Sequence, residues 1–85
     1  MVSLKLYLVT CELLQNGDYA SFRSRLRTFE ASQVLANQWA LRSTHTAVEL
    51  KEILRQFLHE GDRIVVAEVG AERASRRALA NLTEL

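Results

Sequence analysis

Residues 3–12, SLKLYLVTCE, decide the fold of this chain. Successive side chains of an extended strand point to opposite faces, so residues two apart share a face. Both faces of this stretch are apolar, since one would carry Leu4, Leu6 and Leu8 and the other Tyr7, Val9 and Cys11. A strand that is apolar on both faces is typical of a sheet covered on both sides.

Two amphipathic helices are predicted further along the chain. Over residues 19–30 the apolar side chains recur at spacings of 3, 4 and 3, which is one helical stripe, and Asp18 can cap its start. The second helix begins at Thr46, which forms a capping box with Glu49, and Gly61 supplies a left-handed stop. Its apolar stripe is Leu50, Ile53, Leu54, Phe57 and Leu58.

Three more short strands complete the pattern, over residues 32–36, 38–43 and 63–69. The order is then strand, helix, strand, strand, helix, strand, which predicts an α+β, ferredoxin-like βαββαβ fold with both helices on one face of an antiparallel sheet. We expect one domain over residues 1–70. Residues 71–85 form a tail that favours helix by composition, with Ala78, Leu79 and Leu82 as a stripe that could dock on the domain or on a partner.

Two helices can cover only one face of such a sheet, whereas the first and last strands are apolar on both. The second face of a lone domain would be an exposed apolar patch. A homodimer joined through that face, with two-fold symmetry, is the simplest arrangement that covers it.

Composition sets the class of protein but not its function. The 85 residues are 48% apolar and 25% charged, which is ordinary for a single globular domain, and the formal net charge is +1. One cysteine excludes an intrachain disulfide and an all-cysteine zinc site. No apolar run is long enough to span a membrane and no signal-peptide pattern is present, so we expect a cytoplasmic protein without membrane contact.

Arginines gather in two places, at Arg23, Arg25 and Arg27 and at Arg76 and Arg77. Such clusters usually only solvate a helix face, and the alternative is contact with the phosphates of RNA or DNA. Trp39 is expected in the core or an interface, because a single aromatic residue does not make a base-stacking platform.

Carboxylates are the other candidates for chemistry. Glu12 ends the first strand, and Glu68 lies in the last one. Two carboxylates brought together within a chain or across a dimer could hold Mg²⁺ or Mn²⁺, although a strand-end carboxylate is more often only solvated. Cys11 could act as a nucleophile, but the only possible histidine bases, His45 and His59, have structural roles at helix ends.

Several segments resemble a known family. Residues 6–13, LYLVTCEL, look like a first strand that ends in Tyr-Asp-Leu, and residues 37–41, NQWAL, look like a Ser-Thr-Trp strand. The run from Ser43 to Val69 resembles the second helix and last strand of the same proteins. Residues 4–70 are thus similar to small SinR-like proteins, which are themselves similar to the small ferredoxin-fold subunit of the CRISPR spacer-acquisition complex, an endoribonuclease-like protein.

The resemblance implies a homodimer that works as a nucleic-acid-binding scaffold. In the CRISPR-associated relatives, the aspartate that ends the first strand faces its symmetry mate and is implicated in metal-dependent phosphodiester cleavage. Glu12 stands at that position here and Cys11 stands at the tyrosine, so the carboxylate is shifted by on the order of an ångström, which can cost about 100-fold in rate. The first hypothesis is therefore a binding scaffold with little or no catalysis. The alternatives are a protein-interaction module that docks through its tail and a metal-dependent endonuclease that uses Glu12.

Overall fold

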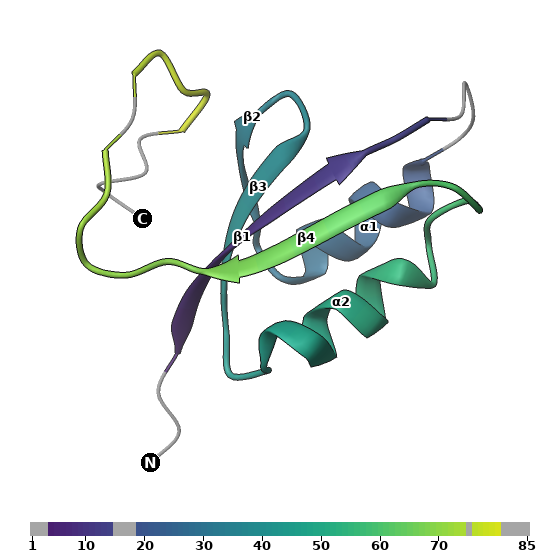
Figure 1. The fold of residues 1–85 in the computed structure, drawn as a ribbon, viewed down its shortest axis with the longest axis horizontal. Helices are drawn as coiled ribbons and strands as arrows, with labels where there is room; N and C mark the ends of the chain where they lie inside the picture. The colour runs from purple at the N-terminus through teal and green to yellow at the C-terminus, as the bar shows by residue number, and fades with distance from the viewer. Residues whose placement is uncertain (1–3, 15–18, 75, 81–85) are drawn as a thin grey trace.

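The computed structural model describes residues 4–14, 19–74 and 76–80, and these form four strands and two helices (Figure 1). The strands make one antiparallel sheet in the order β2-β3-β1-β4. This arrangement confirms the predicted βαββαβ order and the ferredoxin-like fold. The elements are β1 (Lys5–Glu12), α1 (Ala20–Thr28), β2 (Ser32–Leu35), β3 (Gln38–Ser43), α2 (Ala47–Arg55) and β4 (Arg63–Glu68).

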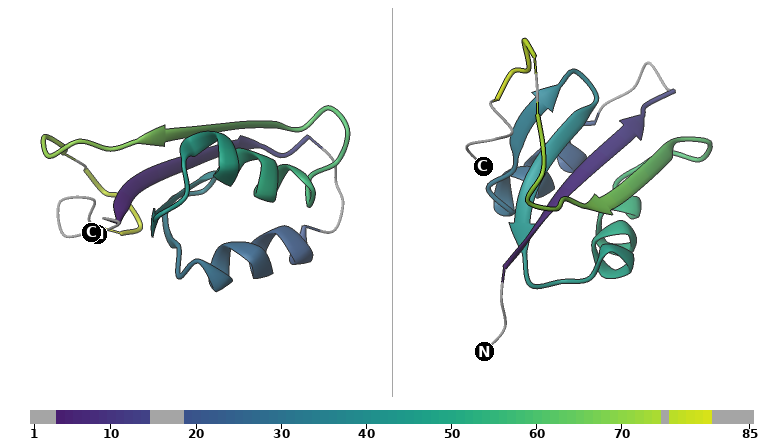
Figure 2. Two further views of the ribbon diagram at one scale, coloured as in Figure 1. Left: turned by 90° about the horizontal axis from the view of Figure 1, so that it is seen from below. Right: turned by 60° about the vertical axis from the view of Figure 1, so that its left-hand side comes forward.

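The central strand β1 sets the register of the whole sheet. Val9 lies opposite Trp39 of β3 on one side and Val66 of β4 on the other. Both helices lie on the same side of the sheet (Figure 2, left), and the odd-numbered residues of β1 face them. This is the helix-covered face, and its alternation is the one that the sequence predicts.

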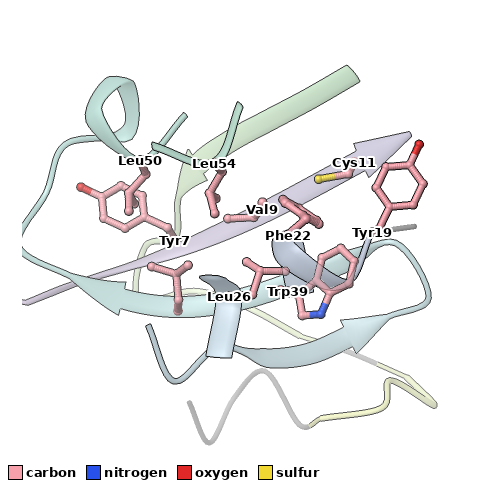
Figure 3. Packing of buried hydrophobic residues seen from close by; sticks show 10 residues of the cluster. Tyr7, Val9, Cys11, Tyr19, Phe22, Leu26, Trp39, Leu50 and Leu54 are labelled. Carbon is pink, nitrogen blue, oxygen red and sulfur yellow. The ribbon is translucent and has the colours of Figure 1, made fainter. Parts of the chain in front are cut away.

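The main core fills the space between the helix-covered face and the two helices (Figure 3). Phe22 and Leu50 are fully buried, and the rings of Phe22 and Trp39 meet edge to face with centroids 5.8 Å apart. Trp39 is therefore a core residue, as predicted. The buried members are Tyr7, Val9, Cys11, Tyr19, Phe22, Leu26, Trp39, Leu41, Leu50 and Leu54.

The start of α2 has the predicted capping box. The hydroxyl of Thr46 accepts the Glu49 N–H at 3.2 Å, and the Glu49 carboxylate accepts the Thr46 N–H at 2.9 Å. The helix ends at Arg55, a turn earlier than its apolar stripe predicts, because residues 56–58 turn toward β4. Gly61 has φ +92°, so it supplies the left-handed residue within that connection and not directly at the helix end.

The start of α1 differs from the expectation. The residue at the N-cap position is Tyr19, whose side chain makes no capping hydrogen bond. Asp18, the predicted cap, lies outside the described residues. The hydroxyl of Tyr19 instead reaches Asp62, before β4, so this side chain ties the helix start to a distant connection.

The opposite face of the sheet, here called the open face, carries the even-numbered residues of β1. Its buried centre is Leu6, Val34 and Ala40, and Ala78 of the tail packs against these three. The Leu79 N–H also donates to the Val34 carbonyl at 2.7 Å. The tail therefore docks on the domain, and it covers the part of the open face nearest β2.

The predicted tail helix is wrong for the described residues 71–74 and 76–80, none of which is helical. The tail leaves β4 and turns back toward β2 (Figure 1). A path along the sheet gives Ala78 apolar contact and Leu79 a backbone partner, and these outweigh a helix propensity of only tenths of a kcal/mol per residue. Leu82, the last member of the predicted stripe, lies outside the described residues.

The described part of the tail leaves the β4 side of the open face uncovered. Val65 is 62% exposed, Ala67 is exposed and Leu8 is half-buried. The apolar patch on which the homodimer prediction rests is therefore smaller than the sequence indicates, but it persists beside β4. Neither helix within the described residues has the length and apolar character needed to cross a membrane.

Replacing Leu50 by alanine tests the helix–sheet core. We expect a loss of about 2–5 kcal/mol in the free energy of unfolding, because the side chain is fully buried and leaves a cavity. Val48 is 66% exposed on the same helix, so Val48→Ala is the matched control and should change stability by less than about 0.5 kcal/mol. Urea unfolding measures both, and equal losses of stability in the two variants would contradict the described packing.

Candidate functional site

Glu12 is exposed at the end of the central strand β1, opposite Arg63 of β4. One Glu12 carboxylate oxygen lies 3.5 Å from the Arg63 guanidinium, and both side chains are more than half exposed. An ion pair this exposed contributes little to stability. It does place the Arg63 guanidinium beside Glu12, the residue at the position to which the family resemblance assigns the catalytic carboxylate.

Glu12 and Glu68 do not meet within one chain. Glu12 pairs with Arg63 and Glu68 pairs with Tyr7, so they stand five register positions apart, about 17 Å at the usual rise of a strand. They also belong to opposite faces of the sheet, and Glu68 lies 3.8 Å from the Lys5 amine.

A divalent cation does not fit Glu12 of a single chain. The described residues contain no cluster of three or more histidine, cysteine, aspartate or glutamate side chains that could hold a metal ion. Mg²⁺ and Mn²⁺ bind through several oxygen ligands, and the candidate carboxylate here already has a guanidinium beside it. The expected metal site would need a second Glu12 from another chain.

A groove of about 550 Å³ opens beside Glu12 at the end of β1. Among the described residues that line it, Glu12 is the only one with an exposed ionisable side chain. This part of the chain therefore makes the groove mainly apolar and gives it no second carboxylate for catalysis. The lining residues are Cys11, Glu12, Leu13, Leu14, Ala36 and Asn37.

Asp62 accepts several hydrogen bonds from distant parts of the chain. Its Oδ1 accepts the Leu14 N–H at 2.8 Å, its Oδ2 accepts the His59 N–H at 2.8 Å, and the Tyr19 hydroxyl donates to both oxygens. These bonds join the connection after β1, the start of α1 and the turn before β4. Asp62 is therefore a structural clamp, and a carboxylate whose two oxygens are both engaged is poorly placed to act as a base.

Electrostatics at Asp62 favour its ionised form. Burial alone would raise the pKa of this carboxyl, but the hydrogen bonds from Leu14, His59 and Tyr19 outweigh burial, and the His59 charge adds to them. The pKa of Asp62 is therefore held below its ordinary value. The sequence offers Asp62 only as an acid before the last strand, and no local pattern predicts partners that are 43 and 48 residues away.

Cys11 is buried under the helices and is unsuited to be a nucleophile. Only 1% of the residue is exposed. Burial, and then the negative charge of Asp62, raise the pKa of the Cys11 thiol to about 12. Because the thiolate is the reactive form, covalent catalysis by this residue is disfavoured.

Both histidines have structural partners, but His59 does not lie in the last turn of a helix as predicted, because α2 ends at Arg55. His45 Nδ1 lies 3.0 Å from the Ser43 hydroxyl, and the His45 carbonyl accepts the Tyr7 hydroxyl at 2.8 Å. The ring of His59 packs edge to face on Tyr19, with centroids 5.0 Å apart.

The five candidate arginines fall into two environments. Arg25 is half-buried, with its guanidinium 5.1 Å from the centre of the Phe29 ring, which is a cation–π contact. The other four are exposed, and among the described residues their guanidinium groups make no hydrogen bond or ion pair. They are Arg23 and Arg27 on α1 and Arg76 and Arg77 in the tail.

Four other cations in the described chain are paired with acids. Lys5 lies beside Glu68, Lys51 and Arg55 beside Glu52, and Arg63 beside Glu12. The four exposed candidate arginines differ from these in being available to an external anion. This distinction depends on which acids fold next to which cations, and the sequence does not show it.

Comparison with known proteins finds no matching family, curated protein or solved structure. The likeness to SinR-like proteins thus stays a prediction, and the function is inferred from the site itself.

The pKa of Asp62 predicts a component of acid unfolding. A carboxyl with a lowered folded-state pKa stabilises the fold fully above about pH 5, and this contribution is lost as the pH falls below the ordinary aspartate value of about 3.9. Asp62→Asn should therefore be less stable at pH 7 and should lose less stability between pH 5 and 2. Urea unfolding across this range tests it, with exposed Glu60→Gln as control. A pH profile unchanged by Asp62→Asn would contradict the clamp.

The environment of Cys11 predicts a slow thiol. At pH 8 a pKa of about 12 in place of 9.0 lowers the thiolate fraction roughly 1000-fold, and burial also blocks access. A chromogenic disulfide reagent should therefore react slowly with the folded protein and rapidly in denaturing urea. Rapid reaction of the folded chain would show that Cys11 is accessible.

Proposed function

We propose that this chain is a homodimeric scaffold that binds the sugar–phosphate backbone of nucleic acid and has little or no catalytic activity. The observation that carries the proposal is the contrast between the four unpaired, exposed arginines and the four cations that acids neutralise. Guanidinium groups in water match phosphate oxygens by paired hydrogen bonds. Two such pairs of arginines give this small domain local positive charge although its net charge is only +1.

The burial of the aromatic residues favours contact with phosphates over recognition of bases. All six aromatic side chains are buried or half-buried in the domain, so no fully exposed ring is presented for a base to stack on. Arginines on a helix and on a tail then contact the backbone, which is the same for every sequence. We therefore expect sequence-tolerant, salt-sensitive binding. The aromatic residues are Tyr7, Tyr19, Phe22, Phe29, Trp39 and Phe57.

The homodimer has separate support. The β4 side of the open face keeps apolar residues in solvent, with Val65 and Ala67 exposed. Burying such a patch against a second copy would remove it from water. The likeness of residues 4–70 to SinR-like proteins points the same way.

Catalysis is disfavoured by the surroundings of Glu12. The carboxylate has an arginine at 3.5 Å, and it borders a groove to which the described residues bring no second acid. A metal-dependent endonuclease would need the Glu12 residues of two subunits to lie close together. Each Glu12 would also have to lose its ion pair with Arg63. Docking of another protein is the remaining alternative, for which the exposed β4 side of the open face is the best surface.

Binding of labelled single- and double-stranded RNA and DNA at increasing salt tests the proposal. Replacing Arg23, Arg27, Arg76 and Arg77 by serine should weaken binding and should flatten the salt dependence by about one unit of slope for each phosphate that is no longer neutralised. Lys51→Ser with Arg55→Ser is the control, because those cations are already paired. Absence of binding at low salt, or equal weakening in both sets, would overturn the nucleic-acid function and leave the protein-interaction module.

The same samples, incubated with Mg²⁺ or Mn²⁺, test catalysis. We expect no cleavage above background. Cleavage by the wild-type chain that is lost in Glu12→Gln would contradict the scaffold function and support the endonuclease. Cleavage that survives this substitution would point to a contaminant or to a different site.

A further inference from the structure

The two edges of the sheet are protected to different degrees. β2 is short, its register shifts between Gln33 and Leu35, and its Val34 carbonyl accepts the Leu79 N–H of the tail. Bulges and covering segments are the usual means by which an edge strand is kept from pairing with another chain. The tail runs away from β4 (Figure 1), and within the described residues β4 pairs only with β1.

The peptide groups of β4 alternate in direction. The Val69 N–H donates to the Leu6 carbonyl at 2.8 Å, so the odd-numbered residues of this strand hydrogen-bond to β1. The N–H and C=O groups of Ile64, Val66 and Glu68 therefore point off the edge of the sheet. Three alternate residues thus present a donor and an acceptor for a further antiparallel strand.

The side chains of β4 do not hinder pairing of this edge with another strand. The middle of β4, Ile64 to Ala67, is apolar and contains no proline, glycine or charge. Charges stand only at its ends, and each is held by β1, Arg63 by Glu12 and Glu68 by Lys5. An exposed, unbulged apolar edge of this kind is a template for strand pairing.

We infer that the β4 edge is the contact by which a second copy of this chain binds, through antiparallel pairing of β4 with β4 about a two-fold axis at Val66. This contact specifies the proposed homodimer and rests on it. A two-fold axis perpendicular to the sheet pairs Val66 with the partner's Val66 and Ile64 with the partner's Glu68. Each of these pairs exchanges two main-chain hydrogen bonds, because all of them use outward-pointing groups.

Side-chain chemistry selects this register. On the open face Val65 comes to lie beside the partner's Ala67, so the exposed apolar side chains of the two copies contact each other across the new strand pair. On the helix-covered face the partner's Glu68 comes to lie beside Ile64, at a groove whose lining includes Arg55, Glu60 and Asp62. A register centred on Val65 would instead set Asp62 opposite the partner's Glu68, with like charges facing each other.

This contact forms one continuous eight-stranded sheet from two copies, with the two β2 strands at its far edges. It differs from the face-to-face dimer that the sequence predicts, because the open faces would lie side by side and not against each other. The part of the open face that the tail occupies then needs no second cover.

Val66→Pro and Val66→Ala form a matched pair of tests. Both remove the valine side chain, but only proline removes the outward N–H, and neither removes a hydrogen bond to β1. Sedimentation should give a dimer for the wild type and Val66→Ala. Val66→Pro should dissociate at least about tenfold more readily, since both hydrogen bonds at the axis depend on this residue. A monomeric wild type, or a proline variant that dimerises as well as the alanine variant, would overturn the inference.

Amide hydrogen exchange on the wild-type dimer supplies a test that needs no variant. The N–H groups of Ile64, Val66 and Glu68 should be as protected as those of Val65 and Ala67. Rapid exchange at the three outward positions of a dimeric sample would place the contact elsewhere, on the open face. Nucleic-acid binding, measured on the same samples, tests the phosphate-binding function separately. Failure of the edge contact and failure of that function are therefore distinguishable.

Discussion

The structure depends on one constraint, which is that β1 has apolar side chains on both of its faces and must be covered on both. Two helices cover the odd-numbered face, where Val9 and Cys11 join the fully buried Phe22 and Leu50 in one core. On the even-numbered face no helix lies within the described residues, and Ala78 of the tail packs against the cluster that contains Leu6. β1 therefore contributes to the core on both faces of the sheet, through Tyr7, Val9 and Cys11 on one and through Leu6 on the other.

Much of the fold could be predicted because its signals are local. Alternation identifies the strands, a stripe at helical spacing identifies the helices, and the Thr46–Glu49 capping box fixes the start of α2. The errors arise where tertiary contacts override propensity. The tail has helical composition but follows the sheet, and α2 ends at Arg55, before Phe57.

The candidate site was predictable in its residues but not in its pairings. Glu12 and the arginine clusters stand out in the sequence, but the ion pair that links Glu12 to Arg63 spans 51 residues and follows only from the register of β1 with β4. The same register separates Glu12 from Glu68, and the folded arrangement leaves Arg23, Arg27, Arg76 and Arg77 without acids among the described residues. Contacts of this range depend on the folded sheet, and no spacing in the sequence encodes them.

The most direct test of this constraint is whether the tail covers the open face, and the measurement is nuclear Overhauser contacts between the Ala78 methyl group and the side chains of Leu6 and Val34 in the folded chain. We expect these contacts, together with slow exchange of the Leu79 amide that donates to Val34. Absence of the contacts, with rapid exchange at Leu79, would contradict this and would mean that the second face of β1 is covered by something other than its own tail.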